Sequence, residues 1–362
     1  MVAVPKLSTL LSAMPPWRAP PGHELMPAAF ARMAEAAGQP PTQLMADFAT
    51  LAFGPGRISF ADYERLRLYD PAFWGVADRR EVAGAGLGRR IARLANFRRD
   101  CGALATDRLA ANAYLAAHGL PTLQVLAICR AGLASAGRTL LRTQGELRQF
   151  LQAQSGAPLV AAPAEGGGSR TLFAGAAAPD AEIERLLDAV RDAGPVSWLF
   201  HPKLTPHPDI AAMTGGAPPP VRVLTIAGEA GAAVVRAAWR LGGRDDLVAS
   251  LDVRTGAVLS LAPAAAPQRG QAVPDGLGVP DWPALKAAAA EGARLFTQFG
   301  LIGWDIAPSA EGPVIVGLDP APDLDLHQLA DRRGVLDHEF ADFLSDRRRL
   351  AAHHHKAERA WR

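Results

Sequence analysis

Two aspartates in the segment LIGWDIAPSAEGPVIVGLDPAP (301–322) are the residues best suited to chemistry. Asp305 lies between Trp304 and Ile306, and Asp319 ends a run of aliphatic residues. An ionised carboxylate in an apolar strand is costly unless it is paired, hydrogen-bonded or bound to a metal. Turn-forming residues between the two aspartates predict a β-hairpin, and a register with Asp305 opposite position 317 puts both carboxylates on one face. The pattern predicts a cation site, with simple capping of two strand ends as the alternative.

An arginine in a second apolar strand also needs a partner. Arg222 alternates with valines in PVRVLTI and shares its own face with Leu224 and Ile226. A guanidinium in such a strand requires an anion. That anion is either the phosphate or carboxylate of a ligand or an internal Asp or Glu, and the sequence leaves both alternatives open.

Glycine-rich segments are the next candidates for binding an anion. In EGGGSR, Glu165 to Arg170, three consecutive glycines let backbone amides approach a phosphate closely, although a plain hairpin loop has the same composition. GAGLG at 84–88 follows no strand, which the pyrophosphate fingerprint requires, so we expect no phosphate-binding role for it.

The histidines of the middle segment suggest no metal centre. His201 and His207 lie in HPKLTPHP, a loop composition without nearby Asp or Cys at metal-ligand spacing. They are interpreted as ordinary loop histidines. A serine hydrolase is not indicated either, because the chain lacks a G-x-S-x-G elbow.

The elements that must position these residues follow from length and periodicity. The chain has 362 residues, of which 49% are hydrophobic, enough for about two domains with a real core. We divide it into an N-terminal helical region (1–100), a first lobe with the glycine-rich loop (101–200), a second lobe (201–350) and a charged tail (351–362). The predicted helices are 27–37, 41–52, 60–68, 89–99, 107–118, 144–154, 179–192, 282–300 and 336–352.

Strand patterns dominate the second half. The predicted strands are 124–129, 158–162, 171–173, 196–200, 220–228, 232–242, 247–253 and 257–263, followed by the hairpin of 301–319. Helices and strands in this order predict an α+β architecture with a lobe on each side of a hinge near 200–204.

Composition narrows the classes of function. With 38 basic and 36 acidic residues, the net charge is only +2 and the basic residues are scattered, so a nucleic-acid partner is not expected. Cys101 and Cys129 are the only cysteines, which fits a reducing compartment. No apolar run reaches the ~18 residues of a membrane span, and prolines interrupt the N-terminal apolar stretch before it forms a signal peptide. We therefore expect a cytoplasmic protein without a membrane span.

Several motifs in order resemble the sugar-transfer-associated ATP-grasp family, over roughly residues 57–345. The resemblance is strongest in the 301–322 segment followed by Gln328 and Gly334. It extends to TDRLAANAYLAAHGLPT, TPHPDIAAM, PVRVLTIAG and DVRTG.

The resemblance implies an α+β ATP-grasp clamp, in which two lobes hold ATP and Mg²⁺, preceded by an N-terminal helical region. Members of the superfamily commonly activate a carboxylate as an acyl phosphate, and this branch is associated with surface-polysaccharide pathways. The expected partners are a nucleotide and a glycan-pathway intermediate or a protein.

The resemblance also assigns roles to individual residues. Arg222 would be catalytic, His207 would contact substrate, and Asp305 and Asp319 would bind Mg²⁺. The nucleotide would be bound by Arg108, Glu165, Gly166, Gly167, Gly168, Arg170 and Lys203.

The departures from the family fall on catalytic positions. An Asp-Lys pair becomes Asp107 and Arg108, a Lys-Pro pair becomes Ala162 and Pro163, and Glu-x-Asn becomes 317–319, which begins with glycine. The glutamates of the hinge are also absent from FHPKL. We therefore expect a degenerate protein that binds a nucleotide weakly, with little or no ligase activity. The alternative is an active ligase or phosphotransferase in which Arg108, Arg170 and Arg222 replace the missing lysine.

Overall fold

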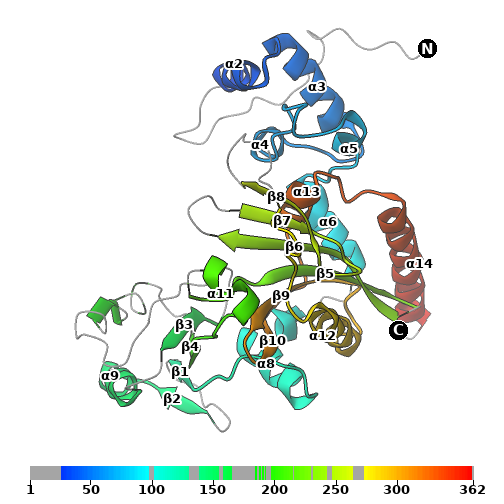
Figure 1. Cartoon of the computed structure of the whole chain (residues 1–362). Helices are drawn as coiled ribbons and strands as arrows, with labels where there is room; N and C mark the ends of the chain where they lie inside the picture. The colour runs from blue at the N-terminus through cyan, green and yellow to red at the C-terminus, as the bar shows by residue number, and fades with distance from the viewer. Residues whose placement is uncertain are drawn as a thin grey trace.

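A computed structural model describes residues 26–97, 102–129, 138–154, 158–164, 197–214, 216–229, 231–242, 247–263 and 273–360, and scattered positions between 184 and 192. Two separate β-sheets form its centre, with helices packed around the larger one (Figure 1). The predicted α+β class is confirmed.

The N-terminal part consists of short helices. They are α2 (Met26–Ala37), α3 (Pro41–Phe53), α4 (Phe60–Arg65), α5 (Val76–Arg80) and α6 (Ala85–Ala95). Ser59 begins α4 with a capping box, since its hydroxyl accepts the amide of Asp62 while the Asp62 carboxylate accepts the amide of Ser59. Helices α2, α3 and α4, with the segments that flank α5, enclose a small core with Met33, Tyr63 and Trp74 at its centre.

A four-stranded sheet forms the smaller lobe. Its elements are β1 (Ala127–Cys129), β2 (Thr139–Leu141), α9 (Gln144–Ala153), β3 (Leu159–Pro163) and β4 (Trp198–Pro202). The preceding helices α7 (Gly102–Thr106) and α8 (Arg108–Ala117) pack into the core of the other, larger sheet through Ala105 and Leu115. The strand order is β2-β1-β4-β3, with β1 and β2 parallel and the other pairs antiparallel. Leu147 and Leu151 of α9 pack on Phe200 and its neighbours and so cover one face of this sheet.

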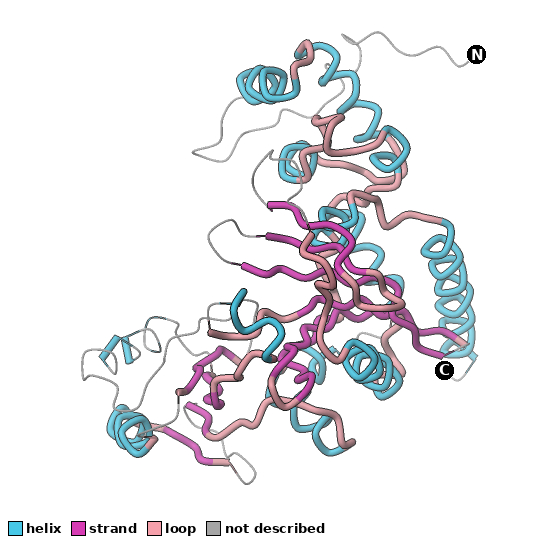
Figure 2. The backbone as a smooth tube through the Cα atoms, in the orientation of Figure 1, coloured by secondary structure: helices cyan, strands magenta, loops and turns pink. Residues whose placement is uncertain are grey.

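A six-stranded antiparallel sheet forms the larger lobe. Its elements are α11 (Pro208–Thr214), β5 (Val221–Gly228), β6 (Gly231–Gly242), β7 (Leu247–Leu251), β8 (Val258–Pro263), α12 (Trp282–Leu295), β9 (Leu301–Ser309), β10 (Gly312–Asp319), α13 (Asp325–Asp331) and α14 (His338–Ala360). The order is β10-β9-β5-β6-β7-β8, which brings the early strand β5 beside the late strand β9. The tube trace in Figure 2 follows this sheet through the middle of the molecule.

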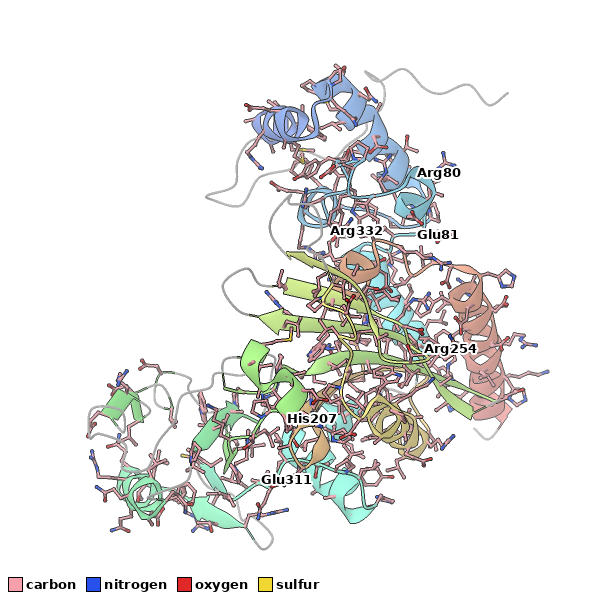
Figure 3. The ribbon with its side chains drawn as sticks, viewed as in Figure 1. Arg80, Glu81, His207, Arg254, Glu311 and Arg332 are labelled. Atoms are coloured by element: carbon pink, nitrogen blue, oxygen red, sulfur yellow. The ribbon has the colours of Figure 1, made fainter. Side chains whose placement is uncertain are left out.

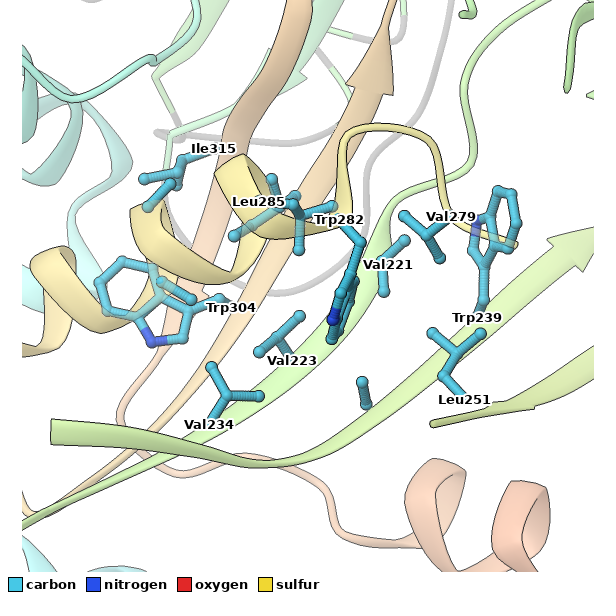
Figure 4. Close-up of a cluster of buried hydrophobic side chains, with 14 of the residues drawn as sticks. Val221, Val223, Val234, Trp239, Leu251, Val279, Trp282, Leu285, Trp304 and Ile315 are labelled. Atoms are coloured by element: carbon cyan, nitrogen blue, oxygen red, sulfur yellow. The ribbon is translucent and has the colours of Figure 1, made fainter. Parts of the chain in front are cut away.

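Alternation along β5 explains the layers on the two faces of this sheet. Val221 and Val223 point toward α12, whereas Leu224 packs with α6 and α14. Figure 4 shows the α12 side, where Trp239, Trp282 and Trp304 join the valines. The helix approaches closely at Gly292, where an added Cβ would lie 2.6 Å from the Trp304 ring.

The N-terminal helices dock on α13 of the larger lobe. The Gln328 side chain exchanges two hydrogen bonds with the backbone of Ala83, at 2.8 and 3.0 Å. Arg65 forms an ion pair with Asp325, and Arg332 stacks on Phe73 at 4.8 Å. Figure 3 labels Arg332 at this junction, near Arg80 and Glu81.

Several element boundaries differ from the sequence-based expectations. The helix expected at 89–99 is α6, which begins at Ala85, so GAGLG is the start of a helix. The strand expected at 124–129 is limited to β1, and α12 ends at Leu295 rather than at Gly300. The last helix continues to Ala360 through most of the predicted tail. No helix in the described part of the chain is long and apolar enough to cross a membrane.

Candidate functional site

A cavity of about 230 Å³ lies between the two sheets. Its walls come from β3 and β4 of the small sheet, from β9 and β10 of the large sheet, and from α7, α8 and the segment 217–220. Most of the lining is aliphatic. The polar and charged lining residues are Arg108, Asn112, Thr122, His201, Lys203 and Asp305.

Strand alternation explains which side chains of the small sheet reach the cavity. On β4 and just beyond it, Leu199, His201 and Lys203 line the cavity, and Val160 and Ala162 do so on the neighbouring β3. Phe200, between them, packs into the core on the opposite face. The period of two therefore places one histidine and one lysine on an otherwise apolar wall.

Arg108 projects into the cavity from the first turn of α8. Asp107 caps that helix by accepting the amides of Leu109 and Ala110. The Arg108 amide donates to the Ala164 carbonyl at 3.0 Å, and Nη1 lies 3.4 Å from the Pro163 carbonyl. Burial lowers the pKa of Arg108, and the nearby charge of Asp305 opposes that effect. A cationic group is thus fixed at the end of β3.

His201 and Lys203 give the β4 wall its polar character. His201 is buried, and its Nδ1 lies 2.9 Å from the Pro202 carbonyl. Burial lowers the pKa of His201, so the ring stays neutral, Nδ1 donates to the carbonyl and Nε2 is left as an acceptor. Lys203 has no ion-pair partner among the residues that the structure describes.

Arg222 and Asp305 bind each other. Nε and Nη2 of Arg222 donate to the two carboxylate oxygens at 2.6 and 2.9 Å, across the β5–β9 pairing that aligns these two residues. Their side chains are 24% and 30% exposed, so the pair is only partly solvated. Of the two partners predicted for Arg222, the internal carboxylate is the one observed.

The hairpin register expected from the sequence is confirmed. Asp305 lies opposite Gly317, and Asp319 lies opposite Gly303. A bulge after Ile315 shifts the register just before this pairing. The Asp319 carboxylate accepts the amide of Ala321 at 2.8 Å, so it also stabilises the turn that follows β10.

Metal binding by Asp305 and Asp319 stays a prediction. One or two carboxylates suffice for Mg²⁺ when phosphates supply further ligands, and each aspartate keeps oxygen lone pairs beyond its observed hydrogen bonds. Among the described residues, no group of three or more His, Cys, Asp or Glu could hold a metal ion alone. A Cβ at Gly317 would lie 3.5 Å from Asp305 Oδ2, so this glycine marks an empty position beside the carboxylate.

The other predicted site residues are placed differently. His207 lies just before α11 between the sheets (Figure 3), and its Nδ1 accepts the amide of Asp209 at 3.3 Å. It does not line the cavity in the described structure. The predicted loop from Glu165 through Gly166, Gly167, Gly168 and Arg170 lies outside the described residues.

Two polar lining residues were not anticipated. Asn112 donates to the Leu123 carbonyl at 2.9 Å, and Thr122 forms a bridge with Ile315 of β10. Asn112 lies in a helix with an ordinary amphipathic pattern, and Thr122 follows a proline. Neither pattern indicates a binding site, because both residues reach the cavity only when the two lobes pack together.

Comparisons with known proteins identify ATP-grasp ligases among solved structures. No protein-family model and no curated protein matches the chain. The similar structures include the ATP-grasp ligase PsnB complexed with a minimal precursor, at 18% identity and a TM-score of 0.40. D-cycloserine synthetase DcsG aligns at 15% identity and a TM-score of 0.42, and the D-alanine-D-alanine ligase from Coxiella burnetii at 8% and 0.43.

The alignments cover between 70% and 74% of this chain and a smaller share of PsnB and of the Coxiella ligase. They span 70%, 74% and 72% of this chain and 64%, 77% and 62% of PsnB, DcsG and the Coxiella ligase, respectively. The chain thus spans less than two thirds of the length of PsnB. At these TM-scores the likeness is partial, and the functional assignment depends on the residues of the cavity.

Proposed function

We propose that this chain is an ATP-grasp-type protein that binds a nucleoside triphosphate between its two sheets and has weak or no ligase activity. The observation that supports this most directly is the cavity itself. Its aliphatic walls suit a base, and Arg108 and Lys203 supply positive charge in the same space. Neither cation has a carboxylate ion-pair partner among the described residues.

Arg108 is the best candidate to replace the lysine missing at Ala162. Its guanidinium lies against the carbonyl of Pro163, at the end of β3, where a lysine at position 162 would begin. A guanidinium can bind phosphate oxygens through two parallel hydrogen bonds, with a geometry different from that of an ammonium. Arginine can therefore preserve nucleotide binding even if it stabilises the transition state of phosphoryl transfer less well than lysine does.

The weak activity follows from charges that are missing or already paired. Phosphoryl transfer depends almost entirely on positioning and electrostatic stabilisation, and each lost charged contact costs several kcal/mol at the transition state. Position 162 is an alanine, position 317 is a glycine, and Arg222 already donates to Asp305. A single Mg²⁺ held by Asp305 and Asp319 would neutralise phosphate charge when bound.

An active ligase or phosphotransferase working through an acyl-phosphate step is the second candidate. It is favoured by the convergence of Arg108, Asp305 and Arg222, since both arginines interact electrostatically with the same carboxylate beside the cavity. We further propose a place in a surface-polysaccharide pathway, with a glycan intermediate or a protein as acceptor. This part rests only on the sequence resemblance.

Titration calorimetry with ATP, with and without Mg²⁺, tests the binding proposal. Arg108→Ala and Lys203→Ala should each weaken ATP binding roughly tenfold or more, because each removes a charge-assisted hydrogen bond. Arg254→Ala is the matched control, since Arg254 is exposed in a distant hairpin turn (Figure 3). Equal affinities in all variants, or no saturable heat at millimolar ATP, would overturn the proposal.

Trapping with hydroxylamine separates the two candidates. An acyl phosphate formed from ATP and a carboxylate substrate is converted to a hydroxamate, so ATP-dependent hydroxamate would establish the active ligase. If no hydroxamate forms although the protein still binds ATP, the result favours the degenerate protein with weak or no ligase activity. Ala162→Lys should then tighten ATP binding, because it returns a cation to the same strand end.

A further inference from the structure

A second hollow, lined mainly by arginines, lies on the N-terminal side of the molecule. It has a volume of about 390 Å³ and shares no lining residue with the cavity between the sheets. Four of its six lining residues are arginines, one from the loop before α4 and three from α6. We call this group of Arg57, Gly86, Leu87, Arg89, Arg90 and Arg93 the arginine hollow.

The four guanidinium groups lack counter-ions among the residues that the structure describes. All four arginines are exposed, and none has a hydrogen-bond or ion-pair partner for its side chain within the described ranges. Asp62 lies close to Gly84 at the start of α6, but its carboxylate is already engaged by Arg65 and Ser59. No carboxylate of the described residues therefore neutralises the positive charge of the hollow.

The arrangement costs stability in the free protein. Arg89 and Arg93 are four residues apart on one helix, and Arg90 and Arg93 are three apart, spacings at which like charges repel. Arg57 has a φ of 52°, a left-handed conformation that a glycine would adopt without steric cost. An anion bound in the hollow would offset both the repulsion and the exposure of four unpaired cations.

Backbone groups can add to the same site. Gly86 and Leu87 are the second and third residues of α6, so their amides have no intrahelical acceptor. Gly84 precedes the helix and has no side chain to cap it, and the Asp62 carboxylate accepts only the amide of the first residue, Ala85. The positive end of the helix dipole thus lies in the same hollow as the arginines.

We propose that the arginine hollow binds a ligand carrying two or more linked phosphate groups. Four guanidinium groups around one concavity call for high anionic charge in a small volume, and a di- or triphosphate supplies it where a single carboxylate does not. Because the site is concave, it suits a compact phosphate group that inserts between the arginines. Both a soluble compound and a lipid whose headgroup enters the hollow can supply such phosphates, and the recognition chemistry is the same.

Inorganic tripolyphosphate is the probe for the first test. Calorimetry on the full chain at low ionic strength should show saturable binding that weakens at least about tenfold in Arg89→Gln/Arg93→Gln. The matched control is Arg348→Gln/Arg349→Gln, which removes the same charge from exposed positions of α14 and should change the affinity less than about twofold. Absence of binding, or an equal loss in the two double variants, would refute the proposal.

Arg57→Gly separates binding from folding. The substitution removes one cation and relieves the left-handed backbone, so the melting temperature should stay the same or rise while tripolyphosphate affinity falls. Unchanged affinity in this well-folded variant would exclude Arg57 from the site and contradict the hollow as described.

Vesicles distinguish the two sources of phosphate. The protein is sedimented with phosphatidylcholine vesicles that contain diacylglycerol diphosphate, with and without tripolyphosphate. Binding that tripolyphosphate displaces, and that the α6 double variant loses, identifies a lipid headgroup, whereas tripolyphosphate binding without vesicle binding identifies a soluble ligand. Vesicle binding that is insensitive to tripolyphosphate and to the double variant contradicts the site.

The arginine hollow and the cavity between the sheets can be tested separately. ATP is itself a triphosphate, so the hollow should give a second, Mg²⁺-sensitive ATP-binding event. Arg89→Gln/Arg93→Gln should remove that event and leave binding sensitive to Arg108→Ala intact. Failure of either set of variants therefore bears on one proposal only.

Discussion

Replacing Arg222 and replacing Asp305 should lower the free energy of unfolding by different amounts. The pair makes two charge-assisted hydrogen bonds, and its side chains are 24% and 30% exposed. Exposed pairs contribute up to about 1 kcal/mol, and breaking a buried pair costs about 3–5 kcal/mol. For this intermediate exposure we expect Asp305→Asn to lower the free energy of unfolding by about 2 kcal/mol.

Arg222→Met should cost less than Asp305→Asn. Without Arg222, the Asp305 carboxylate still interacts with the charge of Arg108. Without the Asp305 charge, Arg222 keeps no other acceptor among the described residues. The single variants should therefore differ by about 1 kcal/mol, and the double variant should show a coupling energy of about 1–2 kcal/mol.

Urea unfolding followed by tryptophan fluorescence measures these differences. Three of the seven tryptophans, Trp239, Trp282 and Trp304, are buried in the core of the large sheet, so the change in emission reports largely on its unfolding. If Mg²⁺ and ATP recruit Asp305, saturating ligand should reduce the measured coupling, because the carboxylate then has another partner. A coupling energy below about 0.5 kcal/mol, or equal losses in the two single variants, would refute this account of the pair.

Three further predictions concern the elements that hold the site. Asn96→Ala should cost about 3–4 kcal/mol in urea unfolding, since its side chain makes four hydrogen bonds, including both backbone groups of Leu301. Gly292→Ala should lower the unfolding free energy by about 1–2 kcal/mol despite the better helix former, because its Cβ would overlap the Trp304 ring; an unchanged midpoint would contradict the close approach. Burial and two neighbouring arginines hold the pKa of His327 at about 3 against 6.5 when exposed, so stability should fall as the pH drops through this interval, by up to about 1.4 kcal/mol per unit. Comparing urea midpoints at several pH values should show a flatter profile for His327→Leu than for the natural chain.

The sequence predicts the hairpin register because the information is local. Alternation and a short turn place Asp305 opposite Gly317, and the structure shows that pairing. The partner of Arg222 is not local in this sense. Its identification requires that β5 pair with β9, across 83 residues, which depends on the order of the whole sheet.

The beginning of α6 was misplaced for a different physical reason. Gly84, Gly86 and Gly88 have poor helix propensity, so the segment reads as a loop. In the folded chain, Asp62 accepts the amide of Ala85, and the inner side of the helix packs on α14. Tertiary contacts overrode local propensity there, and the same error concealed the arginine hollow, which begins in that segment.

The pair of hydrogen bonds between Ala83 and Gln328 also sets an order of events during synthesis. The two residues are 245 positions apart, so at translation rates of roughly 5–20 residues per second Ala83 waits on the order of 10–50 s for its partner. During that interval the inner face of α6, which includes Ile91, has no α14 to cover it. A nascent chain therefore exposes this apolar face throughout that interval, and chaperone binding to the N-terminal helices should end only after α14 has left the ribosome.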